Sequence, residues 1–545
     1  MTAKQTHMGI VGPEGVPEEE VVTAEVCSES DIQEGQVMEV QVCGQEVLLV
    51  RSGGALSALG SRCTHYGAPL STGVLSGGRL RCPWHGACFN VQTGDIEEYP
   101  GLDCLPLHKV TVENNKVFVS AKVKALKQTK RMKEMHSQDP GVTHTVLLIG
   151  GGPAALVCAE TLRQEKYGGR IVMVTRDDLP PYDRTKLSKV MNVEDATIIL
   201  RQMEFLHQYG IEVWLKKEVT SVNAATKTVT LDDGSVHRYD QLLIATGCRP
   251  RLLNCPGADL QNVRTLRNPN DAREIHHASI NRHAVIIGAS FIGMEVASYL
   301  VDMAASVTLI GSSRLPYERT LGPEVGKVTM QMLAEKNVRF YMSDHVTELR
   351  GQNGTVSEVV LKSGVVLPAD IVVLGIGVTP NSEFLEGSSV EMDSKGAVIV
   401  DRFMKTNVPD IFGAGDVTAF PLAGQDPQRV SLGHWQLAQA QGRVAAFNML
   451  DRPLEMSSAP FFWTVLSKKS IRYVGHGEGH TEVILKGNVE ELKFLAFYIK
   501  ADDVVAAASL NFDPAISQLA ERMQAGKRTT RAQAVSEDLS WLKPL

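Results

Sequence analysis

Hydrophobic and polar residues alternate with a period of two in short stretches near the start of the chain, as at 36–42, 46–50 and 116–120. This period is typical of β-strands that bury one face, and glycine and asparagine turns separate the stretches. The pattern predicts a small all-β domain over residues 20–122, preceded by an N-terminal tail at 1–19.

The pattern changes at Thr145, where the β-branched run TVLLI leads into three glycines, an apolar periodic segment and a second run, RIVMVT. This order predicts a strand-turn-helix-strand unit that binds a dinucleotide. Gly150 permits the tight turn, Gly152 lets the backbone approach a pyrophosphate, and the small Ala155 lets the helix pack on the strand. The helix N-terminus then faces the phosphates.

A second motif of the same kind occupies residues 284–295, AVIIGASFIGME, with Gly288, Ser290 and Gly293 in equivalent places after another strand. A single glycine motif is a weak signal, because a tight turn between strand and helix needs no ligand. Two such motifs imply two dinucleotides.

Two further segments complete the pattern. The run LLIATG predicts a strand that ends in a tight turn at Thr246 and Gly247. The segment IFGAGDV follows another extended run and places Asp416 after a turn. A carboxylate there can accept hydrogen bonds from a flavin ribityl hydroxyl.

Composition and charge narrow the class of protein. A chain of 545 residues that is 43% hydrophobic is long enough for several domains. Its 55 basic and 62 acidic residues give a net charge of -7, which provides no field that would attract nucleic acid. The chain has no apolar run of 18 residues, and its start resembles neither a signal nor a transit peptide. We expect a cytoplasmic protein, with association with mitochondria as an alternative.

Two mixed pairs of cysteine and histidine carry the most specific chemistry. Cys63 and His65 form one pair, Cys82 and His85 form the other, and a glycine follows each pair. Two thiolates can hold one iron while two imidazoles hold the other, which is the ligation of a Rieske 2Fe-2S centre. A tetrahedral zinc site is the alternative, although zinc-finger spacing pairs Cys with Cys and His with His.

The segments CTHYGAPL and CPWHGACFN also resemble the two cluster-binding loops of Rieske ferredoxins. The resemblance assigns Cys63 and Cys82 to one iron and His65 and His85 to the other. High-potential Rieske proteins carry an extra cysteine in each loop, where this chain has Ala68 and Trp84. The resemblance is therefore to the lower-potential, ferredoxin-type branch.

The order of glycine motif, ATG, second glycine motif and GAGD resembles the two-dinucleotide flavoprotein reductases over residues 144–452. The resemblance implies that Gly150 and Gly152 bind FAD, that Gly288 and Gly293 bind NAD(P)H, and that Asp416 contacts the flavin. It predicts an FAD-binding domain at 144–280 and 401–454, an NAD(P)-binding domain at 281–400 and a C-terminal domain at 455–545. A basic linker at 123–143, flexible enough to span tens of Å, would join them to the β domain.

The segment PYDRTKLSK at 181–189 resembles the YDRxxLSK segment of oxygenase-coupled ferredoxin reductases and apoptosis-inducing factors. The resemblance places Arg184 and Lys189 at the flavin and pairs Lys189 with Glu295. A cation near the isoalloxazine would stabilise the anionic reduced flavin, and a carboxylate would orient that cation. The alternative is two unrelated surface charges. The resemblance also places Trp435 in an aromatic segment that lies at the edge of the flavin in these reductases.

Two positions depart from the reductase pattern. Arg176 occupies the usual acidic position after the first motif's second strand, so Asp177 becomes the candidate acceptor for the FAD ribose. After the strand SVTLI the usual acid is absent and Arg314 stands nearby, which favours a 2'-phosphate. NADH and NADPH both stay open as cosubstrate.

Taken over nearly the whole chain, the sequence resembles the Rieske-containing, apoptosis-inducing-factor-like flavoproteins. The resemblance implies a multidomain fold in which a small all-β Rieske domain precedes α/β Rossmann-like domains and a C-terminal α+β domain. It implies an oxidoreductase that passes electrons from NAD(P)H through FAD to the 2Fe-2S cluster and on to an unidentified acceptor, with a pro-apoptotic role as a further implication. A redox-sensing signalling protein is the alternative, and a homodimer is one candidate state.

Overall fold

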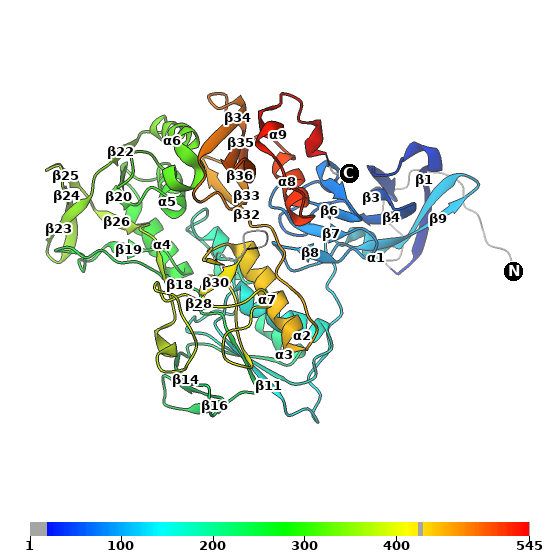
Figure 1. Cartoon of the computed structure of the whole chain (residues 1–545), viewed down its shortest axis with the longest axis horizontal. Helices are drawn as coiled ribbons and strands as arrows, with labels where there is room; N and C mark the ends of the chain where they lie inside the picture. Colours follow the sequence, from blue (N-terminus) through cyan, green and yellow to red (C-terminus); the bar gives the residue numbers. More distant parts are fainter. Residues whose placement is uncertain (1–18, 423–428, 544–545) are drawn as a thin grey trace. The chain divides into compact units, whose positions relative to one another are not determined.

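The computed structural model describes residues 19–422 and 429–543, and the predicted N-terminal tail lies outside them except for Glu19. Contacts divide the chain into two compact units, which are described separately. The first unit holds the described residues up to Glu134 together with residues 513–527 and 536–543. The second unit holds the rest (Figure 1).

The first unit contains two antiparallel sheets. The larger sheet has six strands in the order β1 (Val21–Ser28), β10 (Lys116–Lys122), β9 (Leu107–Glu113), β4 (Ala55–Gly60), β3 (Gln45–Ser52) and β2 (Val37–Val42). In β10, Val117, Val119 and Ala121 are buried in alternation with less buried residues, as the period of two predicts. The smaller sheet contains β5 (Val74–Ser76), β6 (Arg79–Arg81), β7 (Cys88–Asn90) and β8 (Ile96–Glu98).

The second unit contains two parallel sheets of five strands. The first has the order β13 (Ile211–Trp214), β12 (Arg170–Val174), β11 (Thr145–Ile149), β17 (Gln241–Ile244) and β29 (Ile411–Gly413). The second has the order β19 (Val263–Thr265), β26 (Ile371–Leu374), β20 (His283–Ile287), β21 (Ser306–Gly311) and β22 (Val338–Met342). Their central strands are continuous apolar runs because both faces are covered.

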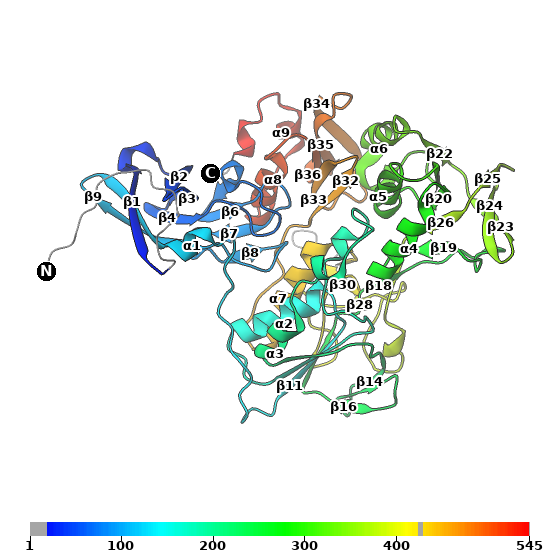
Figure 2. The same cartoon turned by 180° about the vertical axis from the view of Figure 1, so that it is seen from behind.

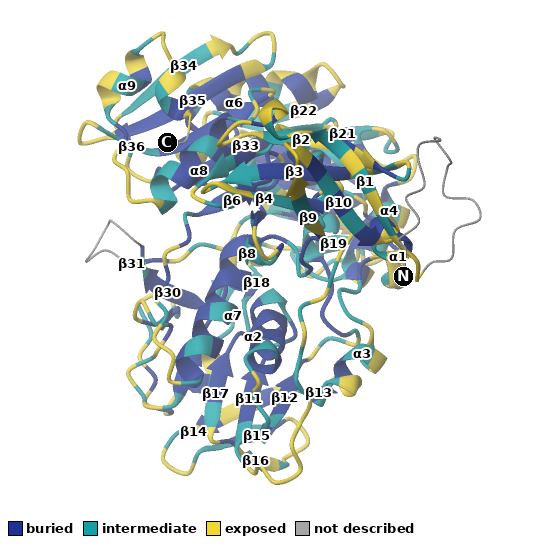
Figure 3. Ribbon diagram, turned by 90° about the vertical axis from the view of Figure 1, so that its right-hand side faces the viewer, coloured by how far each residue is buried: buried dark blue, intermediate teal, exposed yellow. Residues whose placement is uncertain are grey.

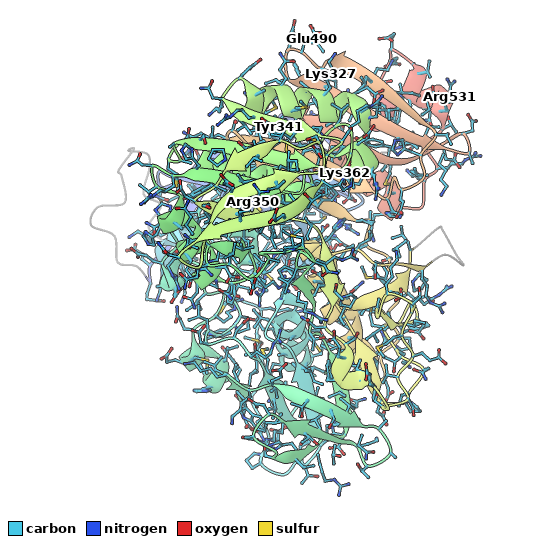
Figure 4. All side chains as sticks on the ribbon, turned by 90° about the vertical axis from the view of Figure 1, so that its left-hand side faces the viewer. Lys327, Tyr341, Arg350, Lys362, Glu490 and Arg531 are labelled. Carbon is cyan, nitrogen blue, oxygen red and sulfur yellow. The ribbon has the colours of Figure 1, made fainter. Side chains whose placement is uncertain are left out.

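The two parallel sheets are built alike. Each has a three-stranded antiparallel sheet beside it: β14 (Val219–Asn223), β15 (Thr228–Leu231) and β16 (Val236–Arg238) in one case, β23 (Val346–Gln352), β24 (Thr355–Leu361) and β25 (Val366–Pro368) in the other. On the surface of the latter, Arg350 pairs with Glu348 and Glu358 (Figure 4). Short sheets complete the region: β18 (Cys248–Pro250) with β27 (Val378–Pro380), and β28 (Val398–Ile399) with β30 (Thr418–Pro421) and β31 (Arg429–Val430).

An antiparallel sheet follows along the chain, in the order β32 (Phe461–Leu466), β33 (Lys469–Gly475), β36 (Asp503–Leu510), β35 (Lys493–Lys500) and β34 (Glu482–Asn488). The helices of the second unit are α2 (Pro153–Gln164), α3 (Met203–Gln208), α4 (Pro269–Ser279), α5 (Phe291–Leu300), α6 (Glu318–Ala334), α7 (Trp435–Met449) and α9 (Arg531–Val535). Those of the first are α1 (Val123–Lys127) and α8 (Ala515–Gln524). No helix in the described part of the chain is both long and apolar enough to cross a membrane.

Helices α2 and α7 lie side by side and are largely buried (Figures 1 and 3). A Cβ at Gly442 would lie 2.2 Å from the carbonyl oxygen of Ala154, so only glycine permits this approach. The contact fixes the start of α2, where the first glycine motif ends.

The stretch 123–143 contains a short helix and several hydrogen bonds to other parts of the chain. Its first residues form α1, and the backbone groups of Arg131 and Cys104 exchange two hydrogen bonds of 2.7 Å. The Arg131 guanidinium also bonds to Asp95 at 2.5 Å. Farther along, the backbone N–H of His136 bonds to Arg163 in the second unit. The predicted linker is therefore bound at Arg131 within the first unit and at His136 within the second.

Candidate functional site

The two predicted cluster loops have the same backbone geometry. In the first loop, the N–H of Cys63 donates to the carbonyl of Ala68 at 2.8 Å and the N–H of Gly67 donates to that of Cys63 at 2.9 Å. In the second, Cys82 donates to Ala87 at 2.8 Å and Gly86 to Cys82 at 3.3 Å. Gly67 and Gly86 have φ of +75° and +80°, a conformation that explains the glycine after each Cys-His pair.

The four candidate ligands gather as two pairs. The Cys63 and Cys82 thiols form a hydrogen bond, which together with burial raises the pKa of Cys63 well above its usual value. The imidazole rings of His65 and His85 lie 5.1 Å apart between centroids. Within residues 19–422 and 429–543, no three His, Cys, Asp or Glu side chains are grouped so as to hold a single metal ion. Two thiols beside two imidazoles fit a 2Fe-2S centre, with one pair on each iron.

The first glycine motif follows β11 and opens α2, as predicted. A Cβ at Gly150 would lie 2.2 Å from the carbonyl oxygen of Ala245, so the turn requires glycine there. A Cβ at Gly152 would meet no atom within 4 Å, which leaves open space at the N-terminus of α2. Ala155 is fully buried. This open space beside backbone N–H groups fits a pyrophosphate.

Asp416 and the turn at Thr246 and Gly247 lie at the ends of adjacent strands, β29 and β17. Thr246 Oγ1 donates to the carbonyl of Asn381 at 2.6 Å, and Asn381 Nδ2 donates back to the carbonyl of Thr246 at 3.0 Å. Burial raises the pKa of Asp416, while the nearby Arg267 and Arg184 oppose that rise. Asn381 could not be identified from the sequence, because it lies 135 residues from its partner Thr246.

Two of the predicted FAD-binding residues pair with each other. Arg184 Nη2 lies 2.5 Å from Asp177 Oδ2, and Arg184 Nη1 donates to the carbonyl of Arg267 at 2.8 Å. The guanidinium also stacks over the Tyr182 ring, 4.5 Å from its centroid. Asp177 is thus held in place after β12, with Arg184 as its partner.

Lys189 and Glu295 form an ion pair of 2.9 Å, although 106 residues separate them. Lys189 Nζ also donates to the carbonyl of Thr185 at 3.0 Å. Glu295 is buried and accepts from Ser188 Oγ as well. The alternative of two unrelated surface charges is wrong for this pair.

Strand β32 supplies two further donors to Glu295 that the sequence did not identify. Thr464 Oγ1 donates to Glu295 Oε1 at 2.8 Å and the N–H of Val465 donates to the same oxygen at 3.1 Å. Thr464 ends the segment FFWT at 461–464, and no motif in the sequence pointed to this bond. The carboxylate, which belongs to α5, is therefore fixed by donors from residues 188–189 and from β32.

Aromatic rings from β32, from the start of α5 and from the residue before α7 contact one another. The Phe462 ring lies 4.7 Å from that of His434 and 5.0 Å from that of Phe291. Burial, with His476 nearby, lowers the pKa of His434 to about 4. Trp435 is half-buried at the first position of α7. His434 is thus a neutral ring near pH 7.

The second glycine motif repeats the geometry of the first. A Cβ at Gly288 would lie 2.1 Å from the carbonyl oxygen of Gly375, which follows β26 as Ala245 follows β17. A Cβ at Gly293 would lie 1.8 Å from the carbonyl oxygen of Gly288. Ser290 is the N-cap residue of α5. This motif too ends at the N-terminus of a helix.

Arg314 lies beyond β21 with its side chain 73% exposed, and its guanidinium lies 3.2 Å from Glu318. Glu318 Oε2 also accepts from the backbone N–H of Arg314 at 3.0 Å. The arginine predicted to favour a 2'-phosphate is therefore available at the surface but has a carboxylate beside it.

Family models match the chain in three consecutive regions. A Rieske [2Fe-2S] domain matches residues 22–111, a pyridine nucleotide-disulphide oxidoreductase matches 144–442 and a reductase C-terminal region matches 461–544. These matches and the observed sheets confirm the predicted fold class. The Rieske match also favours the 2Fe-2S assignment over zinc.

Individual proteins show the same relationship. Apoptosis-inducing factor 3 of Homo sapiens is 46% identical over 96% of this chain and 89% of its own length. The ferredoxin–NAD(+) reductase component of the biphenyl dioxygenase system of Paraburkholderia xenovorans is 30% identical over 67% of this chain and 89% of its own. The crystal structure of the ferredoxin reductase for the CYP199A2 system of Rhodopseudomonas palustris matches with a TM-score of 0.70 and 28% identity, covering 74% of this chain and 100% of that one.

These matches imply FAD, NAD(P)H and a 2Fe-2S cluster as cofactors and agree with the residues that the fold brings together. The chain belongs to the pyridine nucleotide-disulphide oxidoreductases, as an enzyme with a Rieske [2Fe-2S] domain that is similar to apoptosis-inducing factor 3.

Proposed function

We propose that this protein takes electrons from NAD(P)H onto bound FAD and passes them singly to a 2Fe-2S cluster, which delivers them to a separate acceptor. The observation that supports this most is the presence, in one chain, of two paired thiols and imidazoles and of two glycine motifs at helix N-termini. Cys63, His65, Cys82 and His85 would hold the cluster.

The residues of the second unit have distinct roles in this proposal. Gly150, Gly152 and Ala155 would let FAD approach the start of α2, and Asp416 would accept from its ribityl chain. Lys189, oriented by Glu295, would supply positive charge at the flavin. Gly288, Ser290 and Gly293 would do for NAD(P)H what the first motif does for FAD.

A solved relative supports transfer to a bound partner protein. The crystal structure of the covalent putidaredoxin reductase–putidaredoxin complex is 26% identical to this chain with a TM-score of 0.70, covering 74% of this chain and 98% of that one. There the partner is a separate protein. Here we propose that the Rieske domain of the same chain takes the place of such a partner.

The substitution Cys63→Ser tests the proposal. It removes one thiolate ligand and should abolish reduction of a one-electron acceptor, while NADH still bleaches the flavin at the wild-type rate. The control is Cys27→Ser, since Cys27 is a free, half-buried cysteine in β1 of the same unit. Full acceptor turnover by Cys63→Ser would contradict the proposed route.

The similarity to apoptosis-inducing factor 3 supports a second proposal, a redox-sensing and pro-apoptotic role in which nicotinamide binding changes partner binding. A long-lived complex of reduced flavin with the nicotinamide, with slow turnover, would favour this role. Fast multiple turnover with ferricyanide would favour electron transfer as the main function. Cell death that is unchanged by expression of the wild-type chain would contradict the pro-apoptotic role.

A further inference from the structure

Helix α8 packs beside the hairpin that carries the second cluster loop, residues 82–87. Figures 1 and 2 both place α8 beside β6 and β7, the strands that flank this loop. Ser517 and Glu521 are four residues apart, so their side chains share one face of the helix. Both are buried.

Ser517 contacts a predicted ligand residue directly. Its Oγ donates to the carbonyl oxygen of Cys82 at 3.0 Å. The N–H of Gly86, within the loop, donates to the same oxygen at 3.3 Å. The carbonyl of Cys82 therefore receives one donor from its own hairpin and one from α8.

Glu521 acts on the same loop through an arginine. Its Oε1 accepts from Arg81 Nε at 2.5 Å, and Arg81 Nη1 donates to the carbonyl of Gly86 at 2.8 Å. Arg81 precedes Cys82 in the sequence and is buried. Glu521 also lies 3.7 Å from Arg79 and accepts from the Cys88 thiol at 3.6 Å. A buried carboxylate thus fixes the guanidinium that closes the loop.

The first cluster loop is anchored by nearer residues, since Thr64 Oγ1 donates to the carbonyl of Asp103 at 2.7 Å. The second loop instead takes support from a helix more than 400 residues later, which lies outside the Rieske match at 22–111. Residues 513–527 group with the Rieske unit by their contacts, although the reductase C-terminal match includes them.

We propose that α8 completes the cluster site, with Ser517 and Glu521 as positioning residues for the loop that carries Cys82 and His85. The inference rests on the proposed function insofar as a 2Fe-2S cluster is bound there. Hydrogen bonds and charges around such a cluster set its potential and its retention. A donor near Cys82 favours the electron-rich reduced state, whereas the carboxylate of Glu521 disfavours it.

The test uses the full-length protein, purified without oxygen, and the variants Ser517→Ala, Ser517→Thr and Glu521→Gln. The control is Gln518→Ala, a half-buried neighbour on the same helix. The readouts are the midpoint potential from titration followed by electron paramagnetic resonance and the rate of iron release to a chelator.

We expect Ser517→Ala to lower the potential and to release iron roughly tenfold faster. Glu521→Gln should raise the potential. Ser517→Thr keeps the hydroxyl and should keep the wild-type potential and rate of iron release. A general loss of structure would shift the potentials of both variants in the same direction. Opposite shifts of the potential in Ser517→Ala and Glu521→Gln therefore indicate positioning. If Glu521→Gln does not fold, Ser517→Ala and its rescue by threonine decide the matter.

If Ser517→Ala keeps the midpoint potential and the rate of iron release of the wild-type protein, the inference is overturned and the proposed function stays intact. Absence of iron and acid-labile sulfide from the wild-type protein would overturn both.

Discussion

Glu295 is the acceptor for donors from two distant parts of the chain, residues 188–189 and strand β32. Ser188 and Lys189, Thr464, and the N–H of Val465 all bond to its carboxylate. A buried carboxylate with such partners is costly to remove, because the donors and the cation lose their acceptor together. At the scale of single residues this carboxylate is the centre of the predicted flavin site.

The substitution Glu295→Ala should therefore lower the free energy of unfolding by about 3–5 kcal/mol. Denaturant unfolding of the holoprotein measures the change. The control is Asp410→Asn, which breaks the exposed pair between Lys227 and Asp410 and should cost about 0–1 kcal/mol. Equal losses for the two variants would show that Glu295 has no special structural role.

Lys189→Met removes the cation while keeping most of the side-chain volume. If Lys189 stabilises reduced flavin, flavin reduction by NADH should slow roughly 10²-fold and the flavin potential should fall. Stopped-flow absorbance measures the rate. Lys186→Met is the control, since Lys186 lies in the same segment but donates to the carbonyl of Thr197. A wild-type potential in Lys189→Met would remove Lys189 from the flavin site.

Arg314 is the residue that we expect to decide between NADH and NADPH as cosubstrate. If it binds a 2'-phosphate, Arg314→Ala should raise KM for NADPH roughly tenfold and leave that for NADH nearly unchanged. Glu318→Gln removes the competing carboxylate and should lower KM for NADPH. Steady-state kinetics with both nucleotides measures these effects, and equal changes for NADH and NADPH would exclude recognition of the phosphate by Arg314.

At the scale of elements, the glycines of the strand-to-helix turns were predictable because the steric need is local. The spacing of Gly150 and Gly288 placed each turn after the correct strand. Bonds between distant segments were not predictable in this way, and those from Ser517 to Cys82 and from Thr464 to Glu295 depend on how whole elements pack. The pairing of Lys189 with Glu295 was reached only through a family resemblance.

Two glycine substitutions separate packing from ligand binding. Gly442→Ala places a methyl group against the carbonyl of Ala154, so α7 must move from α2 at a cost of about 1–3 kcal/mol. Gly152→Ala meets open space and should leave the apoprotein stable.

Gly152→Ala should nevertheless weaken FAD binding, because the methyl group would occupy the path of the pyrophosphate. Thermal unfolding and FAD titration of the two variants measure these effects. Gly141→Ala is the control, since its Cβ also meets open space but lies outside both motifs. Normal FAD affinity in Gly152→Ala would place the pyrophosphate elsewhere.

At the scale of the whole molecule, the first of the four passages of the chain between the two units is short. Arg131 is bound to Cys104 within the first unit, and His136 is bound to Arg163 within the second. A short connection raises the effective concentration of one partner near the other, and lengthening it lowers that concentration roughly as the −3/2 power of length. If electrons pass between the units as proposed, this passage can be lengthened without touching either site, while the passages at 512–513, 527–528 and 535–536 stay as they are.

An insertion of a flexible Gly-Ser segment after Lys133 tests this idea. Each unit keeps its own contacts, so flavin reduction by NADH and the unfolding temperature should stay at wild-type values. Reduction of the cluster after the flavin should slow at most modestly as the insert grows, because the chain also passes between the units at 512–513, 527–528 and 535–536 and still tethers them there. Single-turnover measurements at several insert lengths would show this trend. A steep fall of the rate with insert length would mean that this passage alone sets how often the units meet, and would contradict the expectation.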